Sequence, residues 1–334
     1  MSVLPRLLIT MGDVAGVGPE VVARAWPDLV GFSAPTVVGD PYWLEMAMQL
    51  IGGSAKVVPI DEVGHEAPGP DTIPCLVATK QDLANTAPGQ VSPAAGKAAY
   101  DFLVAAIRRA VADEADAIVT APLNKESLRA AGVTFPGHTE ILAARTGTKD
   151  YAMVLYGDEL AVAHVTLHMA LRDVFKHLTV PAVLDKIRLL DKLLPRLIGR
   201  PPRLAVAGLN PHAGDGGLFG DEEAKVLTPA VEKAIAEDIE VTGPLPADTL
   251  FARAHRGEFD GVVAPYHDLG HIAMKLRSGF RCVNITAGLP IIRTSVAHGT
   301  AFDIAWRGLA DAASLVEAAR VAARLVQSRD EDEG

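Results

Sequence analysis

Three histidines stand just beyond short apolar runs that are typical of β-strands. His168 occurs in AHVTLHMALRD, His212 in GLNPHAGDGG and His267 in VVAPYHDLGH. Because the strand ends of an open α/β sheet face one crevice, we expect the three side chains to converge there. Three imidazoles with open positions form the donor set through which Zn²⁺ or a similar ion acts as a Lewis acid on a substrate oxygen. Taken singly, each histidine is better explained as a surface or hydrogen-bonded residue, so the metal hypothesis depends on their shared position.

Two aspartates near these histidines could transfer protons. Asp268 adjoins His267, and Asp248 sits in GPLPADTLF, where Pro and Gly restrain a loop after a predicted strand. Either carboxylate could be a general base or could orient a metal-bound histidine. The alternative for Asp248 is the N-cap of a helix that begins near Thr249, because Asp is favoured at that position. The sequence leaves both roles open.

A glycine-rich turn near the N-terminus could approach a ligand. The segment TMGDVAGVGPEVV places Gly12, Gly16 and Gly18 between a predicted strand and helix, with Pro19 in the first helical turn. Such a turn presents backbone N–H groups. Its spacing differs from G-x-G-x-x-G and no acidic residue stands in the ribose position, so an ordinary Rossmann site is not expected. A purely structural turn would look the same.

Several basic and polar residues that could bind an anion fall at positions predicted to be loops. They are His138, Thr139, Lys275, Asn284 and Arg293. Arg293 follows the apolar run Leu289–Ile292, and a guanidinium beside such a run needs a partner. A phosphate or carboxylate of a ligand would serve, and an internal Asp or Glu would serve equally well.

A further loop, SVAHGTAFDIAWRG, brings together polar groups that could bind a nucleoside. It contains His298, Gly299, Thr300 and Asp303. Closely spaced donors and acceptors of this kind can bind an adenine edge and a ribose diol. The alternative is the start of a helix, with Thr300 or Asp303 as its N-cap.

The elements that must position these residues follow from the hydrophobic pattern. The predicted strands are Leu7–Met11, Thr36–Val38, Ala117–Val119, Met153–Tyr156, Leu160–Val165, Arg203–Ala207, Gly261–Ala264 and Val283–Thr286. The predicted helices include Pro93–Asp113, Pro181–Leu194 and one around Ala310–Val326, after which the tail SRDEDEG is expected to be frayed and solvated. Strands alternating with helices predict two α/β halves that enclose a cleft.

Composition limits the class of protein. Of the 334 residues, 49% are hydrophobic and 22% are charged, which is globular, and no apolar run reaches the ~20 residues that cross a bilayer. No export signal is apparent, so we expect a soluble cytoplasmic protein. The net charge of −10 disfavours nucleic acid and membranes as partners, although a local basic pocket can still bind an anionic small molecule. Cys75 and Cys282 are expected to be buried, reduced thiols.

Taken together, the motifs resemble the PdxA family, the 4-hydroxythreonine-4-phosphate dehydrogenases. The matching stretches run through nearly the whole chain in the family's order: GDVAGVGPE, VTAPLNKESL, PGHTE, HVTLHMALRD, GLNPHAGDGGLFGDEE, GPLPADTLF, YHDLGH, VNITAGLPIIRTSVAHGTAFDIA and RGLAD. The resemblance implies NAD-dependent oxidation of a secondary alcohol β to a carboxylate, then decarboxylation of the β-keto acid. It also implies a homodimer with its sites near the subunit interface.

The family fold is similar to that of the isocitrate and isopropylmalate dehydrogenases rather than to the Rossmann enzymes. It implies two α/β domains around a cleft. We place the cofactor-side domain at residues 1–140 plus 295–334. The domain for metal, substrate and dimerisation is placed at 141–294.

The resemblance also implies roles for the residues already singled out. The metal, Zn²⁺ or alternatively Mg²⁺ or Co²⁺, would be bound by His168, His212 and His267. A phosphorylated substrate would be bound by His138, Thr139, Lys275, Asn284 and Arg293. The catalytic candidates are Asp248, Asp268 and Lys275. The segment with His298, Gly299, Thr300 and Asp303 is similar to the HG[ST]A-x-DIA loop that holds the adenosine end of NAD in the isocitrate dehydrogenase relatives.

Departures from the biosynthetic pattern bear on the substrate. Leu269 replaces a usual Gln, His271 is added in YHDLGH, and Ala297 replaces the Asp of SVDHGTA. YHDLGH and HVTLH resemble the catabolic branch, which acts on 4-phospho-threonate and 4-phospho-erythronate. We expect a 4-phosphorylated four-carbon hydroxy acid, because the anion-binding set is retained. The alternatives are a dehydrogenase of an unphosphorylated cis-dihydrodiol acid, a metal-dependent hydrolase or phosphatase, and a non-catalytic phospho-ligand binding protein.

Overall fold

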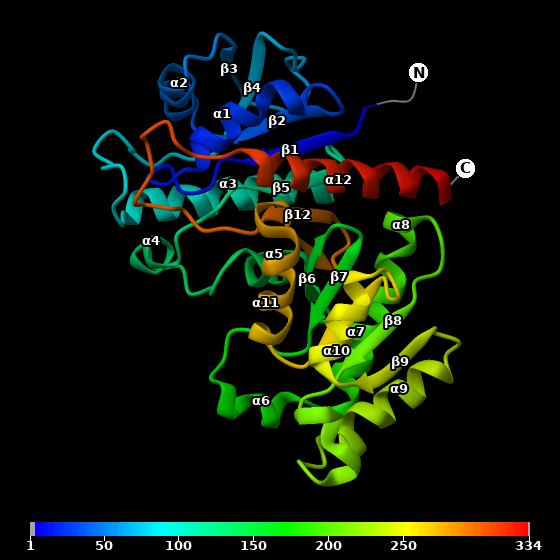
Figure 1. Cartoon of the computed structure of the whole chain (residues 1–334). Coiled ribbons are helices and arrows are strands. Elements are labelled where there is room, and N and C mark those ends of the chain that lie inside the picture. The colour runs from blue at the N-terminus through cyan, green and yellow to red at the C-terminus, as the bar shows by residue number, and fades with distance from the viewer. Residues whose placement is uncertain (1–3, 333–334) are drawn as a thin grey trace. The chain divides into compact units, whose positions relative to one another are not determined.

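The computed structural model describes residues 4–332, and the chain forms two compact units (Figure 1). The first comprises Met1–Lys149 with Leu289–Gly334, and the second comprises Asp150–Gly288. Each unit contains a sheet with helices packed against it, which confirms the predicted α/β class.

The sheet of the first unit is parallel throughout. Its strands follow the order β3 (Lys56–Ile60), β4 (Thr72–Val77), β2 (Ala34–Gly39), β1 (Arg6–Thr10), β5 (Ala117–Thr120) and β12 (Ile292–Val296). Nearly every residue of β1, β5 and β12 is buried. Runs of buried apolar residues, rather than alternating ones, are typical of parallel strands that are covered on both faces.

Helices α3 and α12 pack against the central strands of this sheet. The helices of the first unit are α1 (Gly18–Leu29), α2 (Pro41–Leu50), α3 (Pro93–Val111), α4 (Lys125–Ala130), α5 (His138–Thr146) and α12 (Ala313–Asp332). Helix α3 begins where predicted, because Ser92 accepts a hydrogen bond from the Ala95 N–H and Pro93 occupies the first turn.

The C-terminal segment differs from the prediction. Helix α12 begins at Ala313, where the Asp311 carboxylate accepts from the Ala313 N–H at 2.8 Å. It continues to Asp332, so the expectation of a frayed SRDEDEG tail is wrong for residues 328–332. Residues 333–334 lie outside the described range.

The sheet of the second unit is mixed. Its strands follow the order β11 (Val283–Ala287), β6 (Ala152–Gly157), β7 (Leu160–His164), β10 (Gly261–Ala264), β8 (Leu204–Ala207) and β9 (Val241–Leu245). Strand β6 is antiparallel to both β11 and β7, whereas β7, β10, β8 and β9 are parallel. Asp158 and Glu159 both have positive φ in the tight β6–β7 hairpin, which matches its right-handed twist.

The helices of the second unit connect these strands. They are α6 (Leu171–His177), α7 (Val180–Leu193), α8 (Pro195–Ile198), η1 (Pro211–Gly217), η2 (Glu223–Leu227), α9 (Thr228–Ile235), α10 (Ala247–His255), α11 (His267–Ser278) and η3 (Gly279–Arg281). Helix α11 packs against β6, β7 and β10. It therefore carries its side chains along the part of the sheet where the histidine-bearing strands end.

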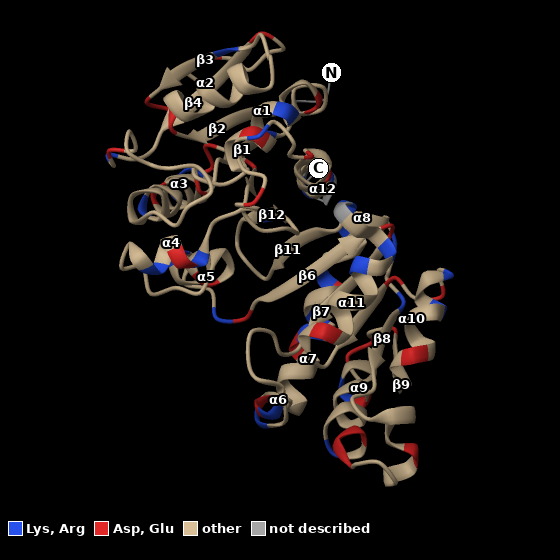
Figure 2. Cartoon of the chain, turned by 60° about the vertical axis from the view of Figure 1, so that its left-hand side comes forward, with Lys and Arg blue, Asp and Glu red and all other residues tan. Residues whose placement is uncertain are grey.

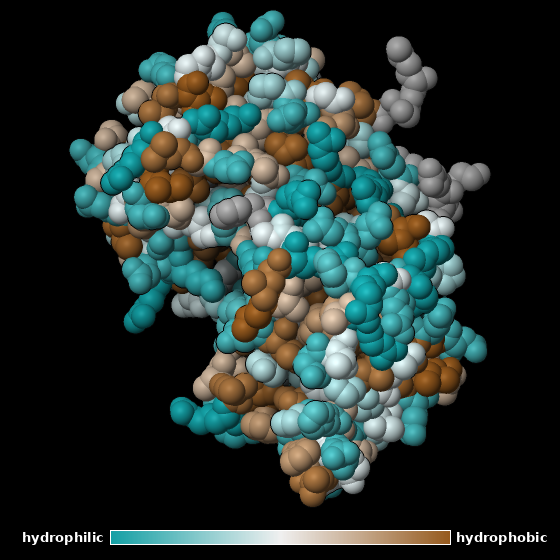
Figure 3. Space-filling view, in the orientation of Figure 1, coloured by the Kyte–Doolittle hydropathy of each residue, from teal (hydrophilic) through white to brown (hydrophobic). Residues whose placement is uncertain are grey.

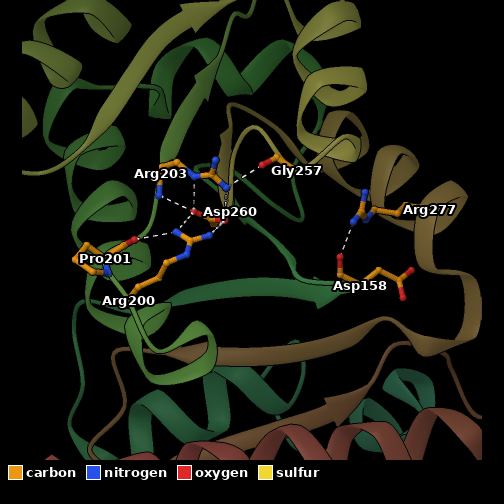
Figure 4. A network of polar contacts seen from close by, with 7 residues as sticks. All are labelled: Asp158, Arg200, Pro201, Arg203, Gly257, Asp260 and Arg277. Carbon is orange, nitrogen blue, oxygen red and sulfur yellow. Dashed lines mark hydrogen bonds and ion pairs between the residues drawn. The ribbon is translucent and has the colours of Figure 1, made fainter.

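An ionic network joins the amino-terminal ends of β8 and β10 (Figure 4). The Asp260 carboxylate accepts from Arg200 Nη2 at 2.7 Å, from Arg203 Nη2 at 3.0 Å and from the Arg203 backbone N–H at 2.8 Å. Burial alone would raise the pKa of Asp260, but the two guanidinium groups outweigh it and lower this pKa far below its ordinary value. The network therefore lies at the amino-terminal ends of these parallel strands, opposite to the carboxyl ends that the histidines follow.

Acidic and basic residues occur in both units (Figure 2), as the composition of 31 Lys and Arg and 41 Asp and Glu leads one to expect. Segments with acidic and basic side chains are interspersed along the elements of both units (Figure 2). None of the helices within residues 4–332 is long and apolar enough to cross a membrane. Cys75 and Cys282 are both free and buried, and burial raises the pKa of Cys282 to about 11.

Candidate metal and substrate site

The three histidines follow three neighbouring parallel strands of the second unit. His168 comes after β7, His267 after β10 and His212 after β8, and β10 pairs with both of the other strands. The carboxyl ends of adjacent parallel strands open on the same edge of a sheet. The common strand-end position expected from the sequence is therefore present.

His168 and His267 lie close together at this edge. Their ring centroids are 5.8 Å apart, and His267 Nδ1 lies 2.6 Å from Asp268 Oδ1. When Nδ1–H donates to that carboxylate, the Nε2 lone pair remains for a metal ion or a substrate. Of the two roles left open for Asp268, this contact provides the orienting one.

A pocket of about 280 Å³ opens beside these two rings. It is lined by Leu167, His168, Met169, Leu171, Val174, Tyr266, His267 and Asp268. Two imidazoles and a carboxylate suit Zn²⁺ or a similar divalent ion, and the apolar remainder of the wall would strengthen electrostatic contacts to a ligand. The residues present therefore fit part of a metal shell.

His212 occupies an unusual backbone segment after β8. His212, Ala213 and Asp215 all have positive φ, with Gly214 and Gly216 between and after them. The His212 ring lies 6.3 Å from that of Phe219. Within the described residues, no three His, Cys, Asp or Glu side chains are placed to hold one metal ion together. The structure thus brings His168 and His267 together and sets His212 on the adjacent strand end.

A buried carboxylate holds the His212 segment in place. Glu223 Oε1 accepts from the backbone N–H groups of Leu209 at 2.8 Å and Asn210 at 2.7 Å, while Oε2 accepts from Asn210 Nδ2 at 2.9 Å. Burial alone would raise the pKa of Glu223, but the hydrogen bonds from Asn210 and Leu209 prevail and lower it. A Cβ on Gly214 would come 2.9 Å from Glu223 Oε2, so the loop closes tightly around this carboxylate.

Two further histidines, to which the sequence assigned no role, adjoin the pair. His164 ends β7 and is 1% exposed, and its Nε2 lies 3.1 Å from His271 Nδ1. The His271 ring stacks on that of His267 with centroids 3.6 Å apart. Burial, together with neighbouring histidine charges, lowers the pKa of His164 to about 3 and that of His271 to about 4. The available signal was the i, i+4 spacing of His267 and His271 on one helix.

Two of the five proposed anion-binding residues belong to the second unit, and neither is in a loop. Lys275 lies within α11, two turns beyond His267, and Asn284 lies in β11. The expectation of loop positions is therefore wrong for both. Asn284 pairs with Leu155 of the antiparallel neighbour β6.

The remaining members of that set lie in the first unit and are also in regular elements. His138 and Thr139 form the first turn of α5, and Arg293 lies in β12, where its Nη2 donates to Thr120 Oγ1 at 2.7 Å. Burial lowers the pKa of Arg293 to about 9, and burial together with the Arg293 charge lowers that of His138 well below its ordinary value. The structure therefore brings Arg293 and His138 into electrostatic contact, with Arg293 charged and His138 neutral at neutral pH.

The glycine-rich turn and the candidate nucleoside loop contact each other within the first unit. The Val17 N–H donates to the Thr300 carbonyl at 3.0 Å, and Asn124 Nδ2 lies 3.4 Å from Thr300 Oγ1. A Cβ on Gly16 would come 2.8 Å from that of Thr300, so glycine is needed for this approach. Residues 302–308 form turns, and the next helix after Thr300 is α12, which begins only at Ala313. The N-cap alternative for Thr300 and Asp303 is therefore wrong.

Asp248 occupies the first turn of α10 but does not cap it. The N-cap is Pro246, without a side-chain cap, and the exposed Asp248 lies two residues further on. The N-cap alternative is wrong because the helix begins at Ala247 instead of near Thr249. A carboxylate in the first turn still interacts favourably with the helix dipole.

Comparison with known proteins gives one consistent relationship. Residues 32–322 match the family model described as pyridoxal phosphate biosynthetic protein PdxA. A 4-hydroxythreonine-4-phosphate dehydrogenase of Beijerinckia indica is 47% identical over 96% of this chain and 94% of its own length. A D-threonate 4-phosphate dehydrogenase of Pectobacterium atrosepticum is 45% identical over 96% and 98%. The crystal structure of a Klebsiella pneumoniae 4-hydroxythreonine-4-phosphate dehydrogenase is 44% identical, with a TM-score of 0.86 over 97% of this chain and 98% of that one.

Proposed function

This chain belongs to the PdxA family, and we propose that it oxidises and decarboxylates a 4-phosphorylated four-carbon hydroxy acid in an NAD-dependent and divalent-metal-dependent reaction. The substrate is 4-phosphooxy-threonine or 4-phospho-threonate or -erythronate. The observation that carries the proposal is the pocket beside His168 and His267, with Asp268 bonded to the His267 ring.

His168, His267 and His212 are the proposed metal ligands. A divalent ion, Zn²⁺ in the first place, supplies Lewis-acid chemistry at a substrate oxygen when it is bound there. Asp268 holds the His267 ring in the tautomer with a free Nε2, and Glu223 holds the loop of His212. Both carboxylates thus support ligands rather than replace them.

The reaction requires a base for the substrate hydroxyl proton. Asp248 and Asp268 are the candidates, acting directly or through water, while the hydride passes to the nicotinamide of NAD. Loss of CO₂ then leaves an enolate that takes up a proton, for which Lys275 is a candidate donor.

Charge and burial support the assignment of the phosphate-binding residues. Arg293, with its pKa of about 9, is a cation at neutral pH, and a buried guanidinium is well suited to bidentate binding of phosphate. His138 and Thr139 supply further polar atoms at the start of α5. Lys275 and Asn284 complete the proposed set. His298, Gly299, Thr300 and Asp303 are assigned to the adenosine end of NAD.

We further infer a cytoplasmic homodimer whose sites lie near the subunit interface. Exposed apolar side chains on α11 support an interface: Ile272 is 59% exposed and Leu276 is 84% exposed. Hydrophobic side chains gather where this helix lies (Figure 3). Soluble monomers rarely leave such side chains uncovered in groups.

The test is spectrophotometric detection of NADH with a panel of substrates. The panel contains 4-phosphorylated four-carbon hydroxy acids and one unphosphorylated cis-dihydrodiol acid. We expect NADH only with a phosphorylated acid and only with metal present. NADH with the dihydrodiol alone would move the chain to the other dehydrogenase class. Phosphate release without NADH would indicate a hydrolase, and binding without turnover would indicate a binding protein.

A further inference from the structure

We propose that His271 and His164 form a positioning pair that fixes the plane of the His267 ring, and through it the metal site. The inference rests on the proposed function, since it assumes that His267 binds metal. The juxtaposition is compact: His271 stacks on His267 with an interplanar angle of 12° and bonds to His164 at 3.1 Å. In this role neither residue binds the substrate or the metal.

The His267 ring is held by two different contacts. Asp268 binds its edge through Nδ1 at 2.6 Å, and the His271 ring covers its face at a centroid distance of 3.6 Å. A hydrogen bond at one edge still permits the ring to tilt about that edge. A parallel ring against the face removes this freedom, so both contacts together define where Nε2 points.

His271 is itself tied to the helix and to the sheet. Its Nδ1 lies 3.1 Å from the His267 carbonyl oxygen and 3.1 Å from His164 Nε2. A carbonyl can only accept, so His271 Nδ1 carries the hydrogen and donates it to the carbonyl and to the Nε2 lone pair of His164. His164 ends β7 and is 1% exposed, so its ring is fixed by the surrounding core.

Gly270 lies beside this pair, where α11 packs on β7. A Cβ on Gly270 would come 2.4 Å from His164 Nε2 and 2.7 Å from Val162 Cγ1. Glycine at this position allows the helix to approach closely enough for His271 to reach His164. The His164 ring, Gly270 and the His271 ring therefore form one fitted contact.

Supporting residues of this kind matter for affinity. Loss of a partner that orients a metal ligand typically lowers metal affinity about 10–100-fold. We expect this loss in His271→Ala, because His267 keeps its Asp268 hydrogen bond but loses its stacked neighbour. His271→Phe keeps an aromatic ring against His267, whereas His271→Leu fills similar space without one. A role in packing alone would make Leu and Phe equivalent.

The experiment is titration of the metal-free full-length enzyme with Co²⁺, followed by the visible absorption of the bound ion. We expect affinity to fall about 10–100-fold in His271→Ala, to fall likewise in His271→Leu, and to be largely retained in His271→Phe. His271→Ala combined with His267→Ala should bind no more weakly than His267→Ala alone. The matched control is His65→Ala, an exposed histidine of the first unit whose partner is Glu62.

The outcomes separate this inference from the proposed function. If the parent binds no Co²⁺, or if His267→Ala binds it as tightly as the parent, the metal-site proposal itself fails. If the parent binds Co²⁺ and His267→Ala does not, but His271→Ala is unchanged, only the positioning pair is refuted. Equal affinities in His271→Leu and His271→Phe also refute it. Thermal unfolding of each metal-free variant shows whether a loss reflects misfolding.

Discussion

At the residue scale, the contact between Asp268 and His267 gives the sharpest expectation. In Asp268→Asn the amide can donate to Nδ1, which favours the tautomer with hydrogen on Nε2 and removes the metal-binding lone pair. We expect metal affinity to fall by about 10–100-fold, with turnover falling in parallel. Bound zinc measured after dialysis, together with kcat, checks this. Asp185→Asn, a partly exposed carboxylate on α7, is the control, and full zinc retention in Asp268→Asn would contradict the assignment.

Arg293 allows a prediction about substrate rather than metal. Arg293→Gln removes the buried cation, and a hydrogen bond to a charged group contributes about 1.5–3 kcal/mol, which corresponds to roughly a 10–150-fold rise in KM for a phosphorylated acid. Zinc content should remain unchanged. Steady-state kinetics of the parent and of Arg293→Gln measure this change in KM. The control variant is Arg129→Gln, at an exposed arginine in the last turn of α4. A fall in kcat at constant KM would instead place Arg293 in the chemical step.

Some contacts between histidines could be predicted from the sequence, and others could not. The strand-end histidines His168 and His267 could be chosen because each follows an apolar run, and the structure places their rings together. His164 could not, because it ends the apolar run LAVAH and its contact with His271 spans 107 positions in sequence. Such pairing depends on which strand a helix packs against, and local patterns do not contain that information.

At the element scale, the loop after β8 depends on one carboxylate. All three groups that bind Glu223 are donors, so in Glu223→Gln the new NH₂ group faces a donor and a buried hydrogen bond is lost, at a cost of about 1–3 kcal/mol. We expect lower stability to urea and weaker metal retention through His212. Glu232→Gln, exposed on α9, is the control. Reduced stability with unchanged metal retention would separate Glu223 from the metal site.

The elements themselves were predicted best where the apolar run was uninterrupted. The eight predicted strands coincide with β1, β2, β5, β6, β7, β8, β10 and β11 to within two residues at either end. Strands β3, β4 and β9 each contain proline, which weakens the strand pattern, and β3 and β9 are edge strands where proline is tolerated. Strand β12 was not predicted, because Arg293 is charged and a charged residue in the sequence pattern indicates a loop rather than a buried strand.

At the scale of the whole molecule, motifs spread along the chain predicted the family and the α/β class, and both are confirmed. The same motifs implied the set of three metal-binding histidines. His212 follows β8 as predicted, but its positive φ was not predicted, and the Glu223 carboxylate binds the backbone just before it at Leu209 and Asn210. The role of His212 as third ligand stays a prediction.

Acid unfolding of the chain should report on Asp260. Its folded-state pKa is lowered from 3.8, so its stabilisation is present above the unfolded pKa and is lost as pH falls from about 4 through the folded value. Asp260→Asn should cost about 1–3 kcal/mol at pH 7, because buried hydrogen bonds to two arginines are lost. Urea unfolding at pH 7, 5 and 3 should show this difference narrowing at pH 3. Asp173→Asn, in an exposed ion pair with Lys176, should change little at any pH. A difference that is equal at pH 7 and pH 3 would mean that Asp260 stabilises the fold by packing rather than by its charge.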